Sequence, residues 1–183
     1  QFPYWPPVIL GHEFAGTVTA IGPDCPKLKP GDRVVAEPHT RACGVCPLCR
    51  TGNIQICPHK RSPGWGIHGG MAPFIVYPEA LLHPIPDSMT WDQAVMVEPT
   101  ANAVTDLIVR GAFTPGDFVV VIGPGPIGLL AALTARACGA RDVVLLGTSG
   151  DESLRMPKAR ELGFSKLLNV QKENPVEAVL GWT

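Results

Sequence analysis

The sequence predicts a protein of the α/β class in which a β-rich domain precedes an open parallel sheet covered by helices. Before Asp117, short apolar segments alternate with turns that hold most of the 20 prolines and 20 glycines, a pattern typical of short strands. After Asp117, strand-like and helix-like segments alternate, which implies parallel strands joined by right-handed crossovers. We therefore expect one domain over residues 1–105 and a second over residues 106–183.

Before Asp117 we expect three strands and one helix. The strands are predicted over residues 14–21, 33–36 and 71–77, because each segment is largely apolar and is bordered by glycine or proline. The helix is predicted over residues 91–110, where apolar residues recur at helical spacing.

In the second domain we expect a strand over 118–122, a helix ending at about 138, a strand over 143–146, a helix over about 152–162 and a strand over 167–170. Pro175 suits the first turn of a further helix. The alternation stops after two and a half strand–helix units, whereas an open doubly wound sheet usually has more. We therefore expect a partial sheet and a chain cut at its C-terminus.

Composition and charge restrict the partners. The chain has 183 residues, 45% of them hydrophobic and 17% charged, with a formal net charge of −1 and no run of like charges. No basic patch therefore predicts binding to nucleic acid or to an anionic membrane. The longest apolar stretch, residues 118–140, is broken by glycines and prolines, which suits a strand, a turn and a helix better than a membrane span.

Four of the six cysteines stand close together, separated by two, two and seven residues: Cys43, Cys46, Cys49 and Cys57. This spacing lets one short loop direct four thiolates at a single tetrahedral zinc ion. Two disulfides or four unrelated thiols are the alternative. A site with four sulfur ligands has no open position, so we expect this zinc to be structural. Cysteines used in this way also favour a reducing compartment, and we expect the cytoplasm.

A glycine-rich turn joins the first strand of the second domain to its helix, with the sequence Gly123-Pro124-Gly125-Pro126-Ile127-Gly128. In this context the first glycine makes the tight turn, the second lets the backbone approach a pyrophosphate, and the third lets helix and strand pack closely. Free N–H groups at the helix N-terminus then bind the phosphates. A glycine-rich turn without a ligand is the alternative.

The choice between NAD and NADP depends on the end of the second strand. An acidic residue for the adenosine ribose is expected about 20 residues past the glycines, but residues 147–149 contain no carboxylate. The hydroxyls of Thr148 and Ser149 and the guanidinium of Arg155 can bind a phosphate, which favours NADP slightly. A solvated helix position is an equal interpretation of Arg155, and the carboxylates at 151 and 152 remain within reach of the ribose.

A second constellation consists of His12, Glu13 and Glu98. Considered alone, His12 suits a buried histidine and Glu98 suits a carboxylate that faces water. However, Glu98 lies in an apolar segment, and a buried carboxylate there needs a partner. A histidine nitrogen and carboxylate oxygens suit a catalytic zinc with an open position, which polarises an alcohol oxygen and lowers its pKa.

The motifs GHEFAGTV, GDRV, the four-cysteine loop, GGMA, VEP and GPGPIG resemble, in order and spacing, the zinc-dependent medium-chain dehydrogenase/reductases. The resemblance covers essentially the whole chain and is greatest for the sorbitol (polyol) and threonine dehydrogenase branch. It implies a GroES-like catalytic domain beside a Rossmann domain, one structural and one catalytic zinc, and a dimer or tetramer. In that branch a glutamate follows the ligand histidine and another glutamate replaces a cysteine ligand, positions that His12, Glu13 and Glu98 match.

The resemblance implies hydride transfer between NAD(P) and a secondary alcohol, either a polyol, a sugar alcohol or an amino alcohol. The family carries its first catalytic cysteine some tens of residues before the GHE motif, whereas only ten residues precede this motif here. We therefore expect an internal piece, about half of such an enzyme, that is inactive or nearly so in isolation. A non-catalytic zinc-binding module and a nucleotide-binding module without chemistry are the alternatives.

Overall fold

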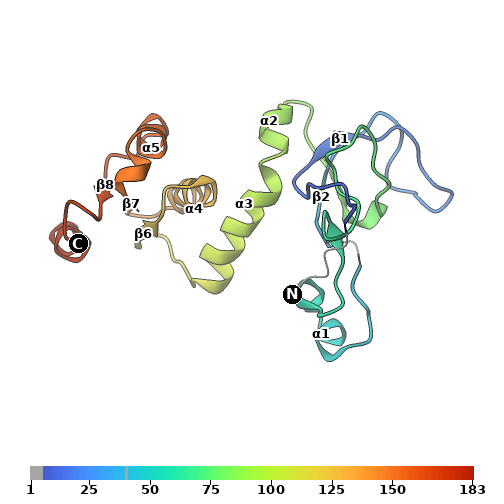
Figure 1. The fold of residues 1–183 in the computed structure, drawn as a ribbon, viewed down its shortest axis with the longest axis horizontal. Coiled ribbons are helices and arrows are strands. Elements are labelled where there is room, and N and C mark those ends of the chain that lie inside the picture. The colour runs from blue at the N-terminus through green and yellow to red at the C-terminus, as the bar shows by residue number, and fades with distance from the viewer. Residues whose placement is uncertain (1–5, 40) are drawn as a thin grey trace. The chain divides into compact units, whose positions relative to one another are not determined.

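A computed structural model describes residues 6–39 and 41–183 of the protein. The chain forms two compact units, Gln1–Glu98 and Pro99–Thr183, and each contains its own sheet (Figure 1). The division falls within helix α3 (Val97–Val104), whereas the boundary expected from sequence lies just after that helix.

The first unit is built on a three-stranded antiparallel sheet with the order β1-β2-β5. These strands are β1 (Ala15–Thr17), β2 (Arg33–Ala36) and β5 (Leu82–Pro84). Strand β2 has the predicted bounds, and its last three residues are buried. Strand β1 is shorter than the prediction over 14–21, and β5 was not predicted.

The prediction of a strand over residues 71–77 is wrong. The structure assigns no strand there, although Met71 donates its N–H to the carbonyl of Leu10 at 2.9 Å. Pro73 has no N–H to contribute to a strand ladder, and the side chain of Val76 is fully exposed. The apolar character of this segment therefore does not mark a strand in this unit.

Short elements between the strands also escaped prediction, because they contain too few residues to show a period. They are α1 (Pro47–Arg50), η1 (Ile54–Ile56), β3 (Ser62–Pro63), β4 (Gly66–Ile67) and η2 (Glu79–Leu81). Helix α1 and η1 lie inside the cysteine loop.

The single helix predicted over residues 91–110 is instead three consecutive helical segments. These are α2 (Trp91–Ala94), α3 and the π-helix η3 (Thr105–Arg110). Thr90 begins α2 with a capping box, since its side chain accepts from the Gln93 N–H while Gln93 accepts from the Thr90 N–H. Pro99 has no N–H to donate to the carbonyl four residues earlier, which explains why α2 and α3 do not form one continuous helix.

The second unit is a parallel sheet with the order β6-β7-β8. Its strands are β6 (Phe118–Ile122), β7 (Asp142–Gly147) and β8 (Leu167–Asn169), and its helices are α4 (Pro126–Ala137), α5 (Arg155–Glu161) and α6 (Pro175–Trp182). The predicted strand–helix alternation and parallel sheet are confirmed (Figure 1). Helix α5 begins later than predicted, because the short helix η4 (Ser149–Asp151) precedes it.

The core of the second unit lies on both faces of β7. Val144 and Leu145 point to opposite faces of the sheet and are 0% and 1% exposed. The small residues Ala132 and Ala135 let α4 pack closely against one face, and Leu168 of β8 packs with Val144 on the other. This packing fixes the carboxyl ends of β6 and β7 side by side.

Candidate functional site

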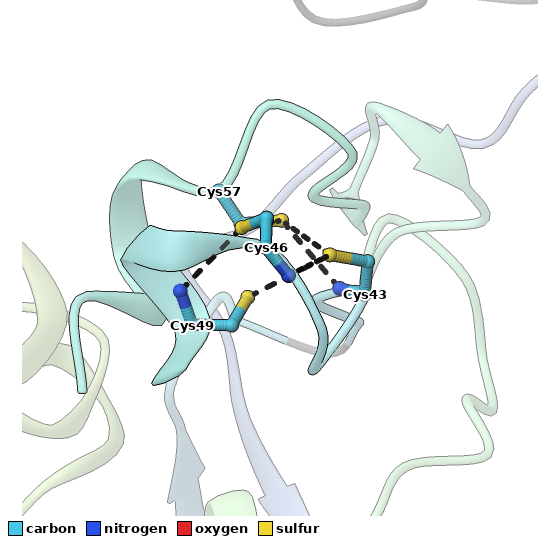
Figure 2. A group of neighbouring side chains, drawn as sticks. All are labelled: Cys43, Cys46, Cys49 and Cys57. Carbon is cyan, nitrogen blue, oxygen red and sulfur yellow. Dashed lines mark hydrogen bonds between the residues drawn. The ribbon is translucent and has the colours of Figure 1, made fainter. Parts of the chain in front are cut away.

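The four cysteines predicted to bind zinc converge in the structure. Figure 2 shows their side chains directed toward one another from the loop that contains α1. The Sγ–Sγ distances are 3.7 Å between Cys43 and Cys57, 3.9 Å between Cys43 and Cys49, and 4.0 Å between Cys46 and Cys57. All four sulfur atoms lie within 4.8 Å of one another.

These distances fit a tetrahedral metal site. With zinc–sulfur bonds of about 2.3 Å, the edges of a four-sulfur tetrahedron measure roughly 3.8 Å. A disulfide requires sulfur atoms about 2.05 Å apart, and all four thiols are free. The cluster therefore fits zinc and not a pair of disulfides.

Backbone hydrogen bonds prepare the cluster for a cation. The Cys46 N–H donates to the sulfur of Cys43, and the Cys49 N–H donates to the sulfur of Cys46, both at 3.4 Å (Figure 2). N–H groups of Val45 and Cys46 lower the pKa of the Cys43 thiol to about 6. Burial, followed by the neighbouring Cys46, raises the pKa of Cys49 to about 12. Without a cation the Cys43 thiol thus ionises readily whereas the Cys49 thiol keeps its proton, and a bound cation would favour the thiolate form of all four.

The second predicted ligand set also comes together. One nitrogen of His12 and one carboxylate oxygen each of Glu13 and Glu98 lie within 4.8 Å of one another, all in the first unit. His12 and Glu98 are half-buried and Glu13 is exposed. One imidazole and two carboxylates are a donor set that suits zinc with a position left open. Residues 86 positions apart in the chain thus form one candidate metal centre.

The backbone beside His12 is held by a glycine-rich segment. Gly70 donates its N–H to the carbonyl of Gly11 at 2.8 Å, and Gly69 donates to the carbonyl of Ile9 at 2.8 Å. A Cβ atom on Gly69 would lie 2.2 Å from the Gly11 carbonyl oxygen. The GGMA motif is therefore needed for close approach of two chain segments, which places His12.

A lysine lies near the carboxylate end of this centre. Burial lowers the pKa of Lys60, while the negative charge of Glu98 acts in the opposite direction. Burial, followed by the positive charge of Lys60, lowers the pKa of His39. Lys60 thus adds positive charge to the surroundings of Glu98, and His39 lies close enough to feel the charge of Lys60.

The glycine turn after β6 has the geometry that a nucleotide-binding turn requires. Gly123 adopts a positive φ of 98° and donates its N–H to the carbonyl of Leu146 at 2.8 Å. A Cβ atom on Gly128 would lie 1.9 Å from the Gly123 carbonyl oxygen, so only glycine allows α4 to begin here. Gly125 has open space around its Cα. Pro126 and Ile127 form the first turn of α4, whose N–H groups suit a pyrophosphate.

The end of β7 carries the residues predicted to meet the adenosine ribose. Thr148 donates from its N–H and its hydroxyl to Asp151, at 2.8 and 2.9 Å. Arg155 donates to the other oxygen of Asp151 at 2.9 Å, and the Ser149 hydroxyl accepts from Asn169 at 3.0 Å. Thr148, Ser149 and Arg155 are exposed, whereas Asp151 is 6% exposed. The buried carboxylate of Asp151 thus holds Thr148 and Arg155 in place, while Asn169 holds Ser149.

Known proteins are similar to this chain over most of its length. The alcohol dehydrogenase GroES-like domain matches residues 2–87. The D-arabitol-phosphate dehydrogenase of Enterococcus avium is 35% identical over 94% of this chain, and the sorbitol dehydrogenase of Halalkalibacterium halodurans is 35% identical over 98%. The chain belongs to the zinc-dependent medium-chain dehydrogenase/reductases. It spans about half the length of these relatives, 49% and 51% respectively.

A solved structure from the same medium-chain family supports the fold of both units. A protein of Sinorhizobium meliloti 1021, described as a zinc-binding dehydrogenase and bound to NADP, matches with a TM-score of 0.86 and 30% identity. The match covers 97% of this chain and 50% of that protein. The GroES-like first unit and the Rossmann-type parallel sheet expected from the sequence are confirmed.

Three residues near these sites were not predicted from the sequence. The ring of Trp65 contacts that of His12 in a tilted arrangement, with centroids 4.5 Å apart, and the charge of Glu98 acts on Lys60. Asp151 was considered only as a ribose ligand. The signals were a tryptophan between two glycines and a lysine inside a basic triplet, and neither predicts a contact across the chain.

None of the helices in the described part of the chain combines the length and apolar character needed to cross a bilayer.

Proposed function

We propose that this chain carries the metal-binding and nucleotide-binding residues of an oxidoreductase that transfers hydride between a secondary alcohol and NAD(P). The observation that carries the proposal is the convergence of His12, Glu13 and Glu98 within 4.8 Å, in a chain that also has a glycine turn opening a helix. The names of the relatives support polyols as the substrate class, and an amino alcohol remains the other candidate.

The residues of the first unit would bind and orient. His12, Glu13 and Glu98 would hold zinc, which when bound supplies Lewis-acid polarisation of the alcohol oxygen. Two carboxylates make this centre polar, and the exposed Glu13 can accept hydrogen bonds from further hydroxyl groups of a substrate. Such a surrounding favours a hydroxylated substrate over an apolar alcohol. The four-cysteine cluster would hold the second, structural zinc.

The residues of the second unit would bind the cofactor. The N-terminus of α4, at Pro126 and Ile127, would receive the pyrophosphate next to Gly125. Thr148, Ser149 and Arg155 would bind the 2′-phosphate, because they are exposed. The nearby carboxylates of Asp151 and Glu152 are engaged, the first by Arg155 and the second by Asn169 and Lys172. We therefore favour NADP slightly, while the pairing of Arg155 with Asp151 leaves NAD as the alternative.

The remaining expectations stay predictions. They are a small-molecule alcohol as the partner, a homodimer or homotetramer, a cytoplasmic location, and little or no turnover by these 183 residues alone. A non-catalytic zinc-binding or nucleotide-binding module stays the second candidate, and binding of NADP without turnover would favour it.

Metal titration of the purified chain tests the proposal. We expect one zinc to be retained at the cysteine cluster through purification and a second to bind on titration with Zn²⁺. His12→Ala should remove the second binding event and leave the first. A single binding event, unchanged by His12→Ala, would contradict the proposed catalytic centre.

A further inference from the structure

We propose that Trp65 is a positioning residue for His12 and sets the metal affinity of the centre formed by His12, Glu13 and Glu98. This inference rests on the proposed metal centre. The indole and imidazole rings lie with their centroids 4.5 Å apart and their planes inclined by 50°. This is the separation at which aromatic rings stabilise each other beyond the area they bury.

The backbone holds Trp65 in one place. Gly64 and Gly66 flank it, and both adopt positive φ values, 78° and 82°, which favour glycine. Trp65 and Ser62 exchange two backbone hydrogen bonds, at 2.8 and 2.9 Å, and Gly64 donates to the carbonyl of Ile67 at 2.9 Å. The indole therefore projects from a closed turn and not from a loose loop.

The same turn packs against the segment that carries His12. A Cβ atom on Gly64 would lie 3.2 Å from the backbone nitrogen of Gly11. From the other direction, Gly70 donates to the Gly11 carbonyl at 2.8 Å. Because the backbone at Gly11 is fixed on both sides, the main freedom left to His12 is rotation of its side chain. The ring of Trp65 lies where it restricts that rotation.

Restricting the imidazole should raise metal affinity. A ligand that already points at the metal loses less conformational freedom on binding. Outer partners that orient ligating histidines typically change metal affinity by roughly 10–100-fold. The Trp65 contact is a ring contact and not a hydrogen bond, so we expect an effect near the lower limit, roughly tenfold.

Cobalt titration, after the retained zinc has been removed with a chelator, measures this effect separately at each site. Co²⁺ in the four-thiolate cluster gives intense sulfur-to-metal charge-transfer absorption, whereas Co²⁺ bound by one nitrogen and carboxylate oxygens gives only weak bands. We expect Trp65→Ala to weaken Co²⁺ binding at the second site by roughly tenfold. The charge-transfer absorption of the cysteine site should stay unchanged. Trp65→Phe, which keeps an aromatic face, should restore most of the affinity.

The controls separate the role of Trp65 from the existence of the second metal centre. Trp91→Ala removes a tryptophan that stacks on Arg33 in the same unit, and it should leave both cobalt sites unchanged. Equal affinity in wild type and Trp65→Ala would overturn the role of Trp65 while leaving the metal centre intact. Absence of a second cobalt site in wild type would overturn both. If Trp65→Ala does not fold, Trp65→Leu, which fills the space without a ring, carries the same comparison.

Discussion

Asp151 shows how one buried carboxylate can organise residues of different function. It accepts hydrogen bonds from the N–H and hydroxyl of Thr148 and from the guanidinium of Arg155. The N–H of Thr148, followed by its hydroxyl and by Arg155, lowers the pKa of Asp151 below its ordinary value of 3.8. The carboxylate is therefore ionised in the folded protein and holds two proposed phosphate ligands in place.

Asp151→Asn tests this role through the pH dependence of stability. A carboxyl whose pKa is lower in the folded state contributes stability above its unfolded pKa and loses it as pH falls. Between about pH 5 and pH 2, wild type should therefore lose more thermal stability than Asp151→Asn. Thermal unfolding at several pH values measures the difference. Equal losses would show that Asp151 is not coupled to its partners.

Two glycines of the turn after β6 should differ in what they contribute. A Cβ atom on Gly128 would overlap the Gly123 carbonyl, whereas Gly125 has open space and a φ of −72° that any residue adopts. We expect Gly128→Ala to lower the free energy of unfolding by about 1–3 kcal/mol. Gly125→Ala should change stability by less than about 1 kcal/mol yet weaken NADP binding. Urea unfolding and calorimetric titration separate the two effects, and a stable Gly128→Ala would refute the packing role.

At the scale of single elements, the four-cysteine loop contains little that could fold without its metal. Its helices, α1 and η1, have four and three residues. Isolated helices of this length are not stable in water. The loop is instead joined by N–H to sulfur hydrogen bonds and, through a donation from the Lys60 N–H to the Cys57 carbonyl at 3.0 Å, to the segment that leads to Trp65.

Cys49→Ser should therefore remove one zinc ligand and also loosen the whole loop. We expect zinc affinity at the cluster to fall by more than about 100-fold, which exceeds the usual effect of losing an outer partner. The loop over residues 43–57 should then become sensitive to protease. Cys138→Ser is the matched control, because Cys138 is exposed and outside the cluster. Zinc content after gel filtration and limited proteolysis are the measurements, and retention of zinc by Cys49→Ser would contradict the four-ligand site.

The sequence predicted elements well where a period or a fixed spacing extends over enough residues. Examples are the apolar segments of β6 and β7 and the spacing of the cysteines. Each of these features is determined by residues that are close together in the chain. The apolar segment over residues 71–77 was wrongly predicted as a strand, because strand formation also needs a pairing partner. The contact between Trp65 and His12 depends on how two distant segments pack, which no local pattern contains.

At the scale of the whole molecule, each unit holds a different proposed ligand. Both metal clusters lie in Gln1–Glu98, and the glycine turn with Thr148, Ser149 and Arg155 lies in Pro99–Thr183. A ligand that binds only the folded form stabilises the unit that contains its site. Metal and cofactor should therefore act on different unfolding transitions.

Differential scanning calorimetry with each ligand tests this division. NADP at about 100 times its dissociation constant adds about 2.7 kcal/mol, which for a domain of about 60–100 residues raises the midpoint by roughly 10–20 °C. We expect that shift in one transition only, while a chelator that removes zinc should lower the other. Gly125→Ala should reduce the NADP shift and keep the response to the chelator. A single transition that responds to both ligands would instead show that the two units unfold as one cooperative body.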